Sequence, residues 1–484
     1  MDLHVPFDGR RDLAGQIYRR IRAAVLAGEL RPGSALPPTR EFAHRLGVSR
    51  NTVSGVYDRL VAEGLLVART GAGTYVRSVA NGAATTPPPA AVAGSPLRAR
   101  RAWEQVLLPP DLTETPLFDF RVGSPDPRLF PYATWRRLLG RQVHPSVVGS
   151  GLPTDPAGHP ALRAAIARHV RVSRGIAASA SDVLVTNGIQ QSVDLVARVL
   201  LAPGARVAVE EPGWSPPRML FTALGARVVP VPVDDEGIVV DGLPDDARLV
   251  YVTPSHQLPL GMAMSHRRRA ALLAWAVRHD AAIIEDDYDT EFRYTDQPLS
   301  PLHSIDHTGR VLYAGTFSKT LLPALRLGFL VAPPSLHHAL LGARFVTDWH
   351  SSLFEQAALA EFIDSGGLAA HVRRMRAVYR LRHREIMAAL VGPLAPWLEV
   401  VGSAAGLHVS AHLRSATATD SSRLVEVARR AGVHIFDFGM FVVDPATRPG
   451  LIFGYGAIPT YRVAEGLRRL HDCVKAVLPA PTSS

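Results

Sequence analysis

Residues 78–113 set the first limit on how this chain folds. The segment is rich in Ala, Pro, Gly and Thr and has too few large apolar side chains to form a core. Its run Pro87–Pro89 favours extended polyproline geometry, so we expect a semi-stiff tether. The tether separates residues 1–77 from residues 114–480, and each of these regions must then fold as a domain around its own core.

The charge of the chain is strongly basic, with a formal net charge of +10 and a pI near 10.1, which suggests a polyanionic partner. Half of the excess lies in residues 1–77, which hold twelve arginines against seven acidic residues. The alternative is a high arginine content spread over the surface. The single cysteine, Cys473, excludes an intrachain disulfide and a cysteine-based zinc site. We find no signal peptide and no apolar run of the roughly 18 residues that a membrane helix needs, so we expect a cytoplasmic protein.

Residues 1–77 have the order of elements of a winged helix-turn-helix. Apolar residues at helical spacing predict a first helix over 13–27. A second helix is expected up to Leu46 with Thr39 as its N-cap, and a third over 50–63 with Ser49 as its N-cap. Two short strands, 65–67 and 74–76, would then flank the glycine-rich residues 69–73 and form the wing.

In such a module the third helix enters the major groove with its first residues on base edges. We expect the DNA-binding residues on this helix and its flanks: Ser49, Arg50, Asn51 and Thr52 near the bases, and Arg40, Tyr57 and Arg69 at phosphates or the flanking groove. The alternative is a three-helix packing domain with a solvated basic face. The stretch LPPTREFAHRLGVSRNTVSGVYDRLVAEGLLVARTGAGTYV resembles the winged helix-turn-helix of GntR-type bacterial repressors, which implies binding to double-stranded DNA. The tether arginines, Arg98, Arg100 and Arg101, are expected to be solvated, with a DNA contact as the alternative.

From Phe118 onward, short apolar runs of β type alternate with helical stretches. This alternation predicts an α/β domain with a mainly parallel sheet. The expected strands are 183–186, 206–209, 248–252, 281–285 and 311–314, and the expected helices are 161–170, 190–201 and 267–279.

The sequence VLYAGTFSKTLLPALRLG, residues 311–328, contains one of only two lysines in a chain that otherwise uses arginine. A desolvated lysine, unlike arginine, can lose its proton and become an amine that forms Schiff bases with carbonyl compounds such as pyridoxal 5'-phosphate (PLP). A lone lysine at a strand end is more often a side chain that reaches out to solvent. However, the hydroxyls of Thr316 and Ser318 before Lys319, and Arg326 after it, suit a phosphate, and they favour the cofactor interpretation.

Two further motifs follow expected strands, where ligands bind in parallel sheets. Thr186–Gln191 opens a helix whose N–H groups and dipole suit a phosphate, and Gly188 would allow close approach, although glycine in such turns is often there for packing. Glu285–Asp289 is an acidic cluster that could hold a metal or be a solvated loop, but histidines or further acids are not at suitable spacing for a metal. With PLP present, a carboxylate there would pair with the pyridine nitrogen and a tyrosine would bond the phenolic oxygen.

Residues from about 118 to 475 resemble the class I aminotransferase-like domain of fold type I. The matching stretches are DFRVGSPDPRLFP, DPAGHPALRAAIARHV, TNGIQQSVDLVARVLL, EEPGW, YVTPSHQLPLGMAM, EDDYDTEFRY and GTFSKTLLPALRLGF. Together with the winged helix, the chain resembles the MocR/GabR subfamily of transcriptional regulators. The resemblance implies a smaller α+β C-terminal subdomain, PLP as cofactor, no metal, and a homodimer with the site at the subunit interface.

The resemblance also implies residue roles. Lys319 would form the internal aldimine, Asp286 would pair with the pyridinium and Tyr288 would bond the ring hydroxyl. Either His256 or Gln257 would make the polar contact to the ring oxygen, and Trp214 would stack near the ring. The phosphate would be held by Thr316, Ser318 and Arg326 and by the backbone of Gly188 and Ile189.

Three positions depart from the family pattern. Pro153 stands where relatives often have a tyrosine that reaches a phosphate, and Pro216 stands where some have a substrate-binding arginine, for which Arg218 is a weak substitute. Ile452 stands where amino-acid transaminases hold the arginine that grips the α-carboxylate. The absence of this arginine argues against efficient transamination and against a simple amino-acid effector, and it favours a sensor of PLP itself, as in regulators of vitamin B6 synthesis.

We therefore expect a dimeric DNA-binding regulator in which PLP, alone or with an amino compound, modulates promoter binding. Transaminase activity would be weak at most. One alternative is a working aminotransferase with a regulatory appendage. The other is a repressor whose C-terminal domain is only a dimerisation scaffold.

Overall fold

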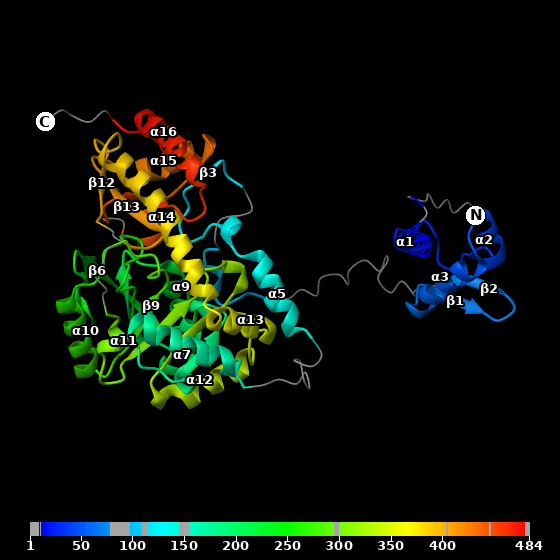
Figure 1. Ribbon diagram of the computed structural model, residues 1–484, viewed down its shortest axis with the longest axis horizontal. Coiled ribbons are helices and arrows are strands. Elements are labelled where there is room, and N and C mark those ends of the chain that lie inside the picture. The colour runs from blue at the N-terminus through cyan, green and yellow to red at the C-terminus, as the bar shows by residue number, and fades with distance from the viewer. Residues whose placement is uncertain are drawn as a thin grey trace. The chain divides into compact units, whose positions relative to one another are not determined.

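The computed structural model describes residues 9, 11–77, 97–108, 115–144, 155–294, 300–402, 405–444 and 447–479. The chain forms two compact units, Met1–Arg98 and Ala99–Ser484 (Figure 1). The tether expected over 78–113 lies largely outside the described residues, and its described part contains the short helix α4 (Arg101–Glu104). The three-part division with limits at 77 and 114 remains a prediction.

The N-terminal unit is a winged helix-turn-helix, as predicted. Three helices share one apolar core, and two antiparallel strands form the wing. The elements are α1 (Leu13–Leu26), α2 (Thr39–Leu46), α3 (Arg50–Ala62), β1 (Leu66–Arg69) and β2 (Gly73–Val76).

The turn between α2 and α3 is set by two residues. Gly47 ends α2 with a φ of 66°, a left-handed conformation that glycine adopts without steric cost. Ser49 caps α3 as predicted, because its Oγ accepts a hydrogen bond from the N–H of Thr52 at 3.1 Å. The prediction of Thr39 as the N-cap of α2 is wrong, since Thr39 is already helical and Pro38 occupies the cap position without a side-chain bond.

The C-terminal unit contains an eight-stranded mixed sheet in the order β4-β11-β10-β9-β8-β5-β6-β7. Neighbours from β10 to β6 are parallel, whereas β11 runs antiparallel between β4 and β10, and β7 is antiparallel to β6. The five predicted strands are all present, and the sheet contains three more that were not predicted, β6, β7 and β11. The strands are β4 (Val183–Thr186), β5 (Arg206–Glu211), β6 (Arg227–Asp234), β7 (Gly237–Ile238), β8 (Ala247–Val252), β9 (Ala282–Asp287), β10 (Val311–Thr316) and β11 (Gly328–Val331).

Helices cover both faces of this sheet, because alternate strand residues point to opposite sides. Val207 and Val209 pack in one core with α8, α9 and α12, and the intervening Ala208 packs in another core with α10 and α11. A third core joins α5, α7 and α13 to β4, β10 and β11. The helices are α5 (Tyr132–Gln142), α7 (Pro160–Arg174), α8 (Ile189–Leu200), α9 (Ser215–Ala223), α10 (His266–Arg278), α11 (Leu302–Ile305), α12 (Pro334–Thr347) and α13 (Leu353–Asp364).

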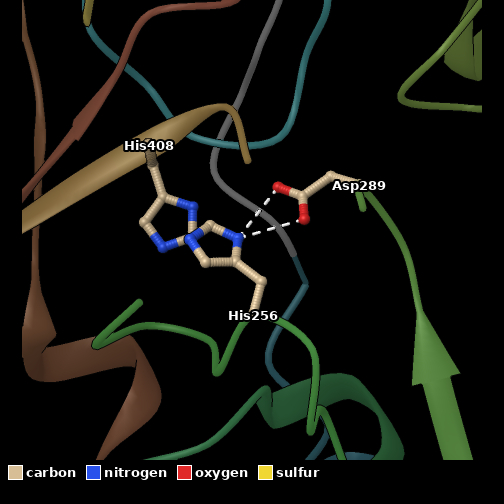
Figure 2. A group of neighbouring side chains, drawn as sticks. All are labelled: His256, Asp289 and His408. Atoms are coloured by element: carbon tan, nitrogen blue, oxygen red, sulfur yellow. Dashed lines mark hydrogen bonds and ion pairs between the residues drawn. The ribbon is translucent and has the colours of Figure 1, made fainter. Parts of the chain in front are cut away.

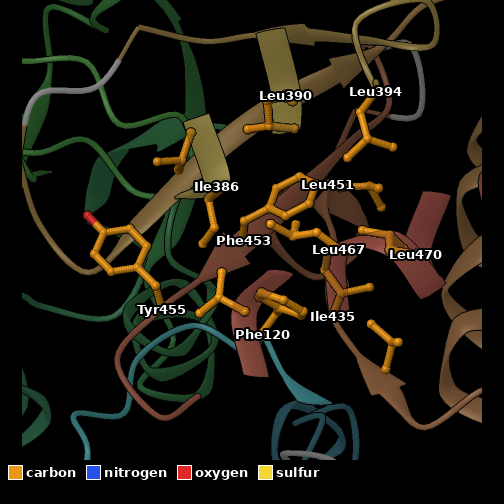
Figure 3. Close-up of a cluster of buried hydrophobic side chains, with 14 of the residues drawn as sticks. Phe120, Ile386, Leu390, Leu394, Ile435, Leu451, Phe453, Tyr455, Leu467 and Leu470 are labelled. Atoms are coloured by element: carbon orange, nitrogen blue, oxygen red, sulfur yellow. The ribbon is translucent and has the colours of Figure 1, made fainter. Parts of the chain in front are cut away.

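A smaller α+β subdomain follows, as predicted, and α14 (Gly367–Val391) leads into it from the larger one (Figure 1). Leu368 at the start of α14 belongs to a core of the large sheet, whereas Ile386 and Leu390 pack in the subdomain core with Phe453 and Leu467 (Figure 3). The other elements of this part are β3 (Phe118–Asp119), β12 (Leu398–Val400), β13 (His408–Leu413), α15 (Ala418–Arg430), β14 (Val433–His434), β15 (Phe436–Asp437), β16 (Gly450–Gly454) and α16 (Thr460–Val477). None of the described helices combines the length and the apolar character that a membrane span requires.

Candidate functional site

Lys319 follows the carboxyl end of β10 and is mostly buried. Its Nζ donates a hydrogen bond to the carbonyl of Gly123 at 2.6 Å. Burial lowers the pKa of Lys319 below its ordinary value, against the opposing effect of Asp289 and Asp286. This lysine does not extend into solvent, and its burial makes the neutral, nucleophilic amine easier to form than it is in water.

Asp286 lies on β9, directly beside β10, where it pairs with Ala314. One carboxylate oxygen accepts a hydrogen bond from the hydroxyl of Tyr251. The other, Oδ1, is buried and has no partner among the described residues. Burial raises the pKa of Asp286 to about 7. A buried oxygen without a donor is costly, and a protonated ring nitrogen would supply both the donor and a compensating charge.

Two groups suited to a phosphate meet at the start of α8. Gly188 precedes this helix with a φ of 86° and no side chain caps it, so the first N–H groups of α8, beginning with Ile189, are oriented to receive an anion. The Arg326 guanidinium donates to the carbonyl of Asn187 and would lie only 3.3 Å from a Cβ at Gly188. A side chain at Gly188 would therefore crowd the space between this helix and the arginine.

The hydroxyls of Thr316 and Ser318 lie together between β10 and Lys319. Their oxygen atoms are 3.0 Å apart, and the N–H of Ser318 donates to the Thr316 hydroxyl at 3.1 Å. Both residues are buried, so these hydroxyls are fixed rather than free to rotate with solvent. The structure thus places each predicted phosphate ligand on β10, the loop after it, or the start of α8.

Tyr288, His256 and Asp289 form a buried chain of hydrogen bonds. The Tyr288 hydroxyl donates to the His256 carbonyl at 2.9 Å and lies 3.1 Å from Nδ1 of the same histidine. That nitrogen lies 3.0 and 3.1 Å from the two Asp289 oxygens (Figure 2). The N–H of Leu407 donates to Asp289 at 3.1 Å, so the chain also connects the large sheet to the smaller subdomain.

Gln257 is occupied elsewhere. Its amide nitrogen donates to the carbonyls of Pro212 and Leu258 at 2.8 and 3.0 Å, and its oxygen accepts from the N–H of Leu260. These bonds hold the loop after β8 and leave its amide no free donor. The geometry therefore does not support Gln257 as a cofactor ligand, and it identifies His256 as the neighbour of Tyr288.

His408 on β13 lies against His256, with ring centroids 4.5 Å apart (Figure 2). Its Nε2 bonds the carbonyl of Pro259 at 3.1 Å, and its buried Nδ1 has no partner among the described residues. Candidate ligand atoms of His256, Asp289 and His408 lie within 4.8 Å of one another, a spacing that a metal could bridge. A metal there would have to replace the hydrogen bond between His256 and Asp289. It would also lie near Lys319, and burial together with the positive charge of Lys319 already lowers the pKa of His408. Local sequence does not predict this cluster, because Asp289 and His408 are far apart in the chain.

The remaining cofactor-site residues are largely apolar. Trp214, half-buried before α9, packs against a cluster that contains Leu258, Leu260, Tyr288, Phe438, Phe441 and Ile452. Ile452 is fully buried on β16, between Ser410 and Phe436. Pro216 lies in the first turn of α9, and Pro153 lies outside the described residues.

In the N-terminal unit, Arg50 and Asn51 are exposed at the start of α3, and Thr52 is half-buried with its hydroxyl 2.8 Å from that of Ser49. Arg40 and Arg69 are exposed, and the Arg69 guanidinium stacks over the ring of Tyr75.

Tyr57 does not fit the DNA-contact prediction. It is buried in the core of the N-terminal unit, and its hydroxyl donates to the carbonyl of Pro37 at 2.9 Å. Because this hydroxyl is already used, Tyr57 stabilises the entry to α2 and does not offer a donor to a phosphate.

Comparisons with known proteins match both units. The family "Bacterial regulatory proteins, gntR family" matches residues 13–76, and "Aminotransferase class I and II" matches residues 151–451. The chain is 39% identical to the probable rhizopine catabolism regulatory protein MocR of Rhizobium meliloti, over 96% of this chain and 94% of that protein. It is 32% identical to the HTH-type pyridoxine biosynthesis transcriptional regulator PdxR of Corynebacterium glutamicum, over 95% of each. A solved kynurenine aminotransferase of Pyrococcus horikoshii, in complex with PMP, superposes with a TM-score of 0.69 at 27% identity, covering 75% of this chain and 91% of that one.

Fold and relatives together define a helix-turn-helix transcriptional regulator fused to a class I aminotransferase domain of fold type I. The relatives match along nearly the whole chain, across both units. The chain belongs to the MocR family of GntR-type regulators, which confirms the predicted fold classes and the resemblance.

Proposed function

We propose that this regulator binds PLP at Lys319 and that the bound cofactor changes its affinity for promoter DNA. The observation that carries the proposal is the unpartnered buried oxygen of Asp286, which lies close enough to Lys319 for the two to interact electrostatically. A pyridinium would satisfy that oxygen. The relative PdxR is a regulator of pyridoxine biosynthesis, which supports the same effector class.

Each residue of the site has a definite task in this proposal. PLP, when bound, supplies an aldehyde that condenses with an amine and a ring that withdraws electrons. Lys319 supplies the amine, and Asp286 holds the proton of the ring nitrogen. Tyr288, whose hydroxyl bonds His256 in the structure, would lie at the ring hydroxyl, and Trp214 would stack beside the ring. The phosphate would accept hydrogen bonds from Thr316, Ser318 and the first N–H groups of α8, and Arg326 would offset part of its charge.

Ile452 favours a sensor over an aminotransferase. A bidentate arginine clamp fixes the α-carboxylate of an amino acid, and an isoleucine offers no donor in its place. Ile452 is fully buried in an apolar cluster, so the position itself presents no charge to a carboxylate. We therefore assign PLP as the main effector, with an amino compound as a possible second ligand and weak transamination at most.

On DNA, we assign base contacts to the start of α3 and phosphate contacts to its flanks. Arg50 and Asn51 are exposed where such helices meet base edges. Arg40 and Arg69 are exposed on the preceding helix and on the wing, where they would orient the protein without reading the sequence. Because the proposed targets are chromosomal promoters, we expect the protein to act in the cytoplasm.

We also propose a homodimer. Four apolar side chains at the end of α12 and the start of α13 are exposed in the single chain: Phe345 by 48%, Val346 by 77%, Trp349 by 41% and Phe354 by 39%. A group of exposed aromatic and aliphatic side chains marks an interaction surface. A second copy would cover it, and a two-fold dimer fits DNA with paired half-sites.

The test is a gel-shift titration of DNA from upstream of the gene, at fixed salt, with apo protein and with added PLP. The account expects PLP alone to change the affinity or the pattern of bands. If only an added amino acid changes them, the effector is a substrate-like amine and the PLP assignment fails. If no specific shift appears under any condition, the aminotransferase alternative gains support.

A further inference from the structure

A cavity of about 280 Å³ in the C-terminal unit lies apart from the residues around Lys319. Helices α4 and α9 and residues 442–443 bound it. Small-molecule sites begin at roughly 300 Å³, so the cavity has room for a small ligand. Its walls are mostly apolar, formed by Ala102, Val106, Met219, Val442 and Val443.

Among the described residues that line this cavity, Arg218 on α9 is the one with a charged side chain. The side chain is half-buried, and burial lowers the pKa of Arg218 below its ordinary value. No described residue forms a hydrogen bond or an ion pair with its guanidinium. Glu211 acts on it electrostatically, but one oxygen of that carboxylate is held by the N–H groups of Val443 and Asp444, at 2.7 and 3.1 Å.

A guanidinium that is partly removed from water and lacks a partner favours the approach of an anion, because the anion restores the lost interactions. The apolar walls favour a ligand with an apolar body. We propose that this cavity binds a small organic anion, such as a short-chain carboxylate, with its charge on Arg218 and its body against Met219 and Val442. The inference goes beyond the cofactor site, and it does not depend on PLP being the effector.

The position of the cavity suggests how a bound ligand would affect DNA binding. Helix α4 lies near the C-terminal end of the expected tether, and Arg100, just before it, donates to the carbonyl of Ala223 at the end of α9 at 3.3 Å. A ligand between α4 and α9 therefore stabilises the point where the tether joins the C-terminal unit. We expect an anion bound there to alter DNA binding in the full-length protein.

Isothermal titration of the full-length protein with hexanoate tests the site, with hexylamine and inorganic phosphate as comparison probes. Hexanoate should bind, hexylamine should not, and phosphate should bind at least roughly tenfold more weakly because it lacks the apolar body. Prior loading with PLP should leave hexanoate binding unchanged. Competition between PLP and hexanoate would place the anion in the cofactor site and overturn the proposal.

Two variants probe the cavity from different sides. Arg218→Gln removes the charge and should weaken hexanoate binding roughly tenfold or more, as the loss of a charge-assisted hydrogen bond does. Ala102→Phe keeps the arginine but fills the cavity, and it should weaken binding as well. Arg198→Gln is the control, because this exposed arginine on α8 pairs with Asp194 and lies outside the lining. Absence of hexanoate binding, phosphate binding as tight as hexanoate, or wild-type affinity in both cavity variants would overturn the assignment.

Discussion

The two ends of the Lys319 site differ in chemistry. At the phosphate end, the start of α8, Arg326, Thr316 and Ser318 bring donors and a positive charge together. At the opposite end, where amino-acid transaminases hold a carboxylate clamp, Ile452 lies buried among Phe438, Phe441 and Leu258. One end gathers hydrogen-bond donors and a positive charge, whereas the expected clamp position at the other end carries an apolar side chain.

This difference separates groups that the sheet architecture positions from groups that depend on single side chains. The groups that would bind the cofactor come from strand ends and a helix start, so they are fixed by the architecture of the sheet. The groups that would bind an amino acid come from individual side chains, which can change without loss of the fold. A domain can therefore keep a cofactor site while losing a substrate site, as a sensor of the cofactor requires.

Lys319→Ala should have the largest effect, because it removes the only amine in the site. We expect complete loss of the absorbance band that covalently bound PLP gives, with an unchanged circular dichroism spectrum. Lys475→Ala is the matched control, since Lys475 is the other lysine of the chain and is exposed on α16. A band that survives in Lys319→Ala but not in Lys475→Ala would mean that the anchor is wrongly assigned.

Asp286→Asn should weaken PLP binding by roughly 10- to 100-fold, the effect of losing a hydrogen bond to a charged group. The amide keeps the size of the side chain but not its charge. Spectroscopic titration with PLP measures the change, and Asp194→Asn on the exposed side of α8 serves as control. Equal affinity in wild type and Asp286→Asn would show that this carboxylate does not face the ring nitrogen.

The apo protein should lose stability as the pH rises, in part because of Asp286. Burial raises the pKa of this group from 3.8 to about 7, so between those values the folded chain keeps a proton that the unfolded chain has released. Folding is then disfavoured progressively up to pH 7, by at most about 4 kcal/mol from this group, and the penalty stays constant above it. Thermal melts of apo Asp286→Asn should show a shallower slope than wild type. Burial also raises the pKa values of Glu210 and Glu285 to about 7, so the variant should still lose some stability as the pH rises. If the melting temperatures of wild type and Asp286→Asn fall equally with pH, Asp286 does not contribute to the loss of stability.

Tyr288→Phe should lower PLP affinity by roughly two- to tenfold, as loss of one neutral hydrogen bond does. His256→Asn should act in the same direction and more weakly, because it affects the ring only through Tyr288. In the double variant the losses should not add, since both changes break one chain of bonds. Fully additive losses, measured by the same titration, would mean that His256 acts independently of Tyr288.

The smallest expected effect concerns the apolar end. PLP-loaded wild-type protein mixed with a panel of amino acids should keep its absorbance spectrum over time, because Ile452 provides no grip for a carboxylate. Free PLP with the same amino acids gives the background rate. Rapid conversion of the bound cofactor would show that another group replaces the arginine, and the contrast between the two ends would disappear.

Much of this architecture was predictable from local sequence. For example, Val183–Thr186 is rich in apolar and β-branched residues, and it forms strand β4 with the predicted limits. Strand β11 is only four residues long and begins two residues after Arg326, so the local pattern does not separate it from the phosphate motif. Tyr57 was assigned to DNA although its spacing from Val53 and Leu60 places it on the buried face of α3, so the helical period was the better guide.

The finer geometry of the site was not predictable. The choice between His256 and Gln257 depends on how the loop after β8 folds back on Pro212 and Leu260. The contacts of Tyr251 with Asp286, and of His408 with His256, join residues that are far apart in the chain. Such contacts arise from the packing of strands and loops, which a local pattern does not encode.

The central claim is that PLP binding and DNA binding are coupled, and coupling between two ligands must be reciprocal. The most direct measurement is therefore the affinity of the full-length protein for PLP with and without a saturating amount of its upstream DNA. The upstream DNA should change the PLP affinity by the same factor by which PLP changes the DNA affinity. Random DNA of equal length should leave the PLP affinity unchanged. Equal PLP affinity with and without the specific DNA would contradict the account.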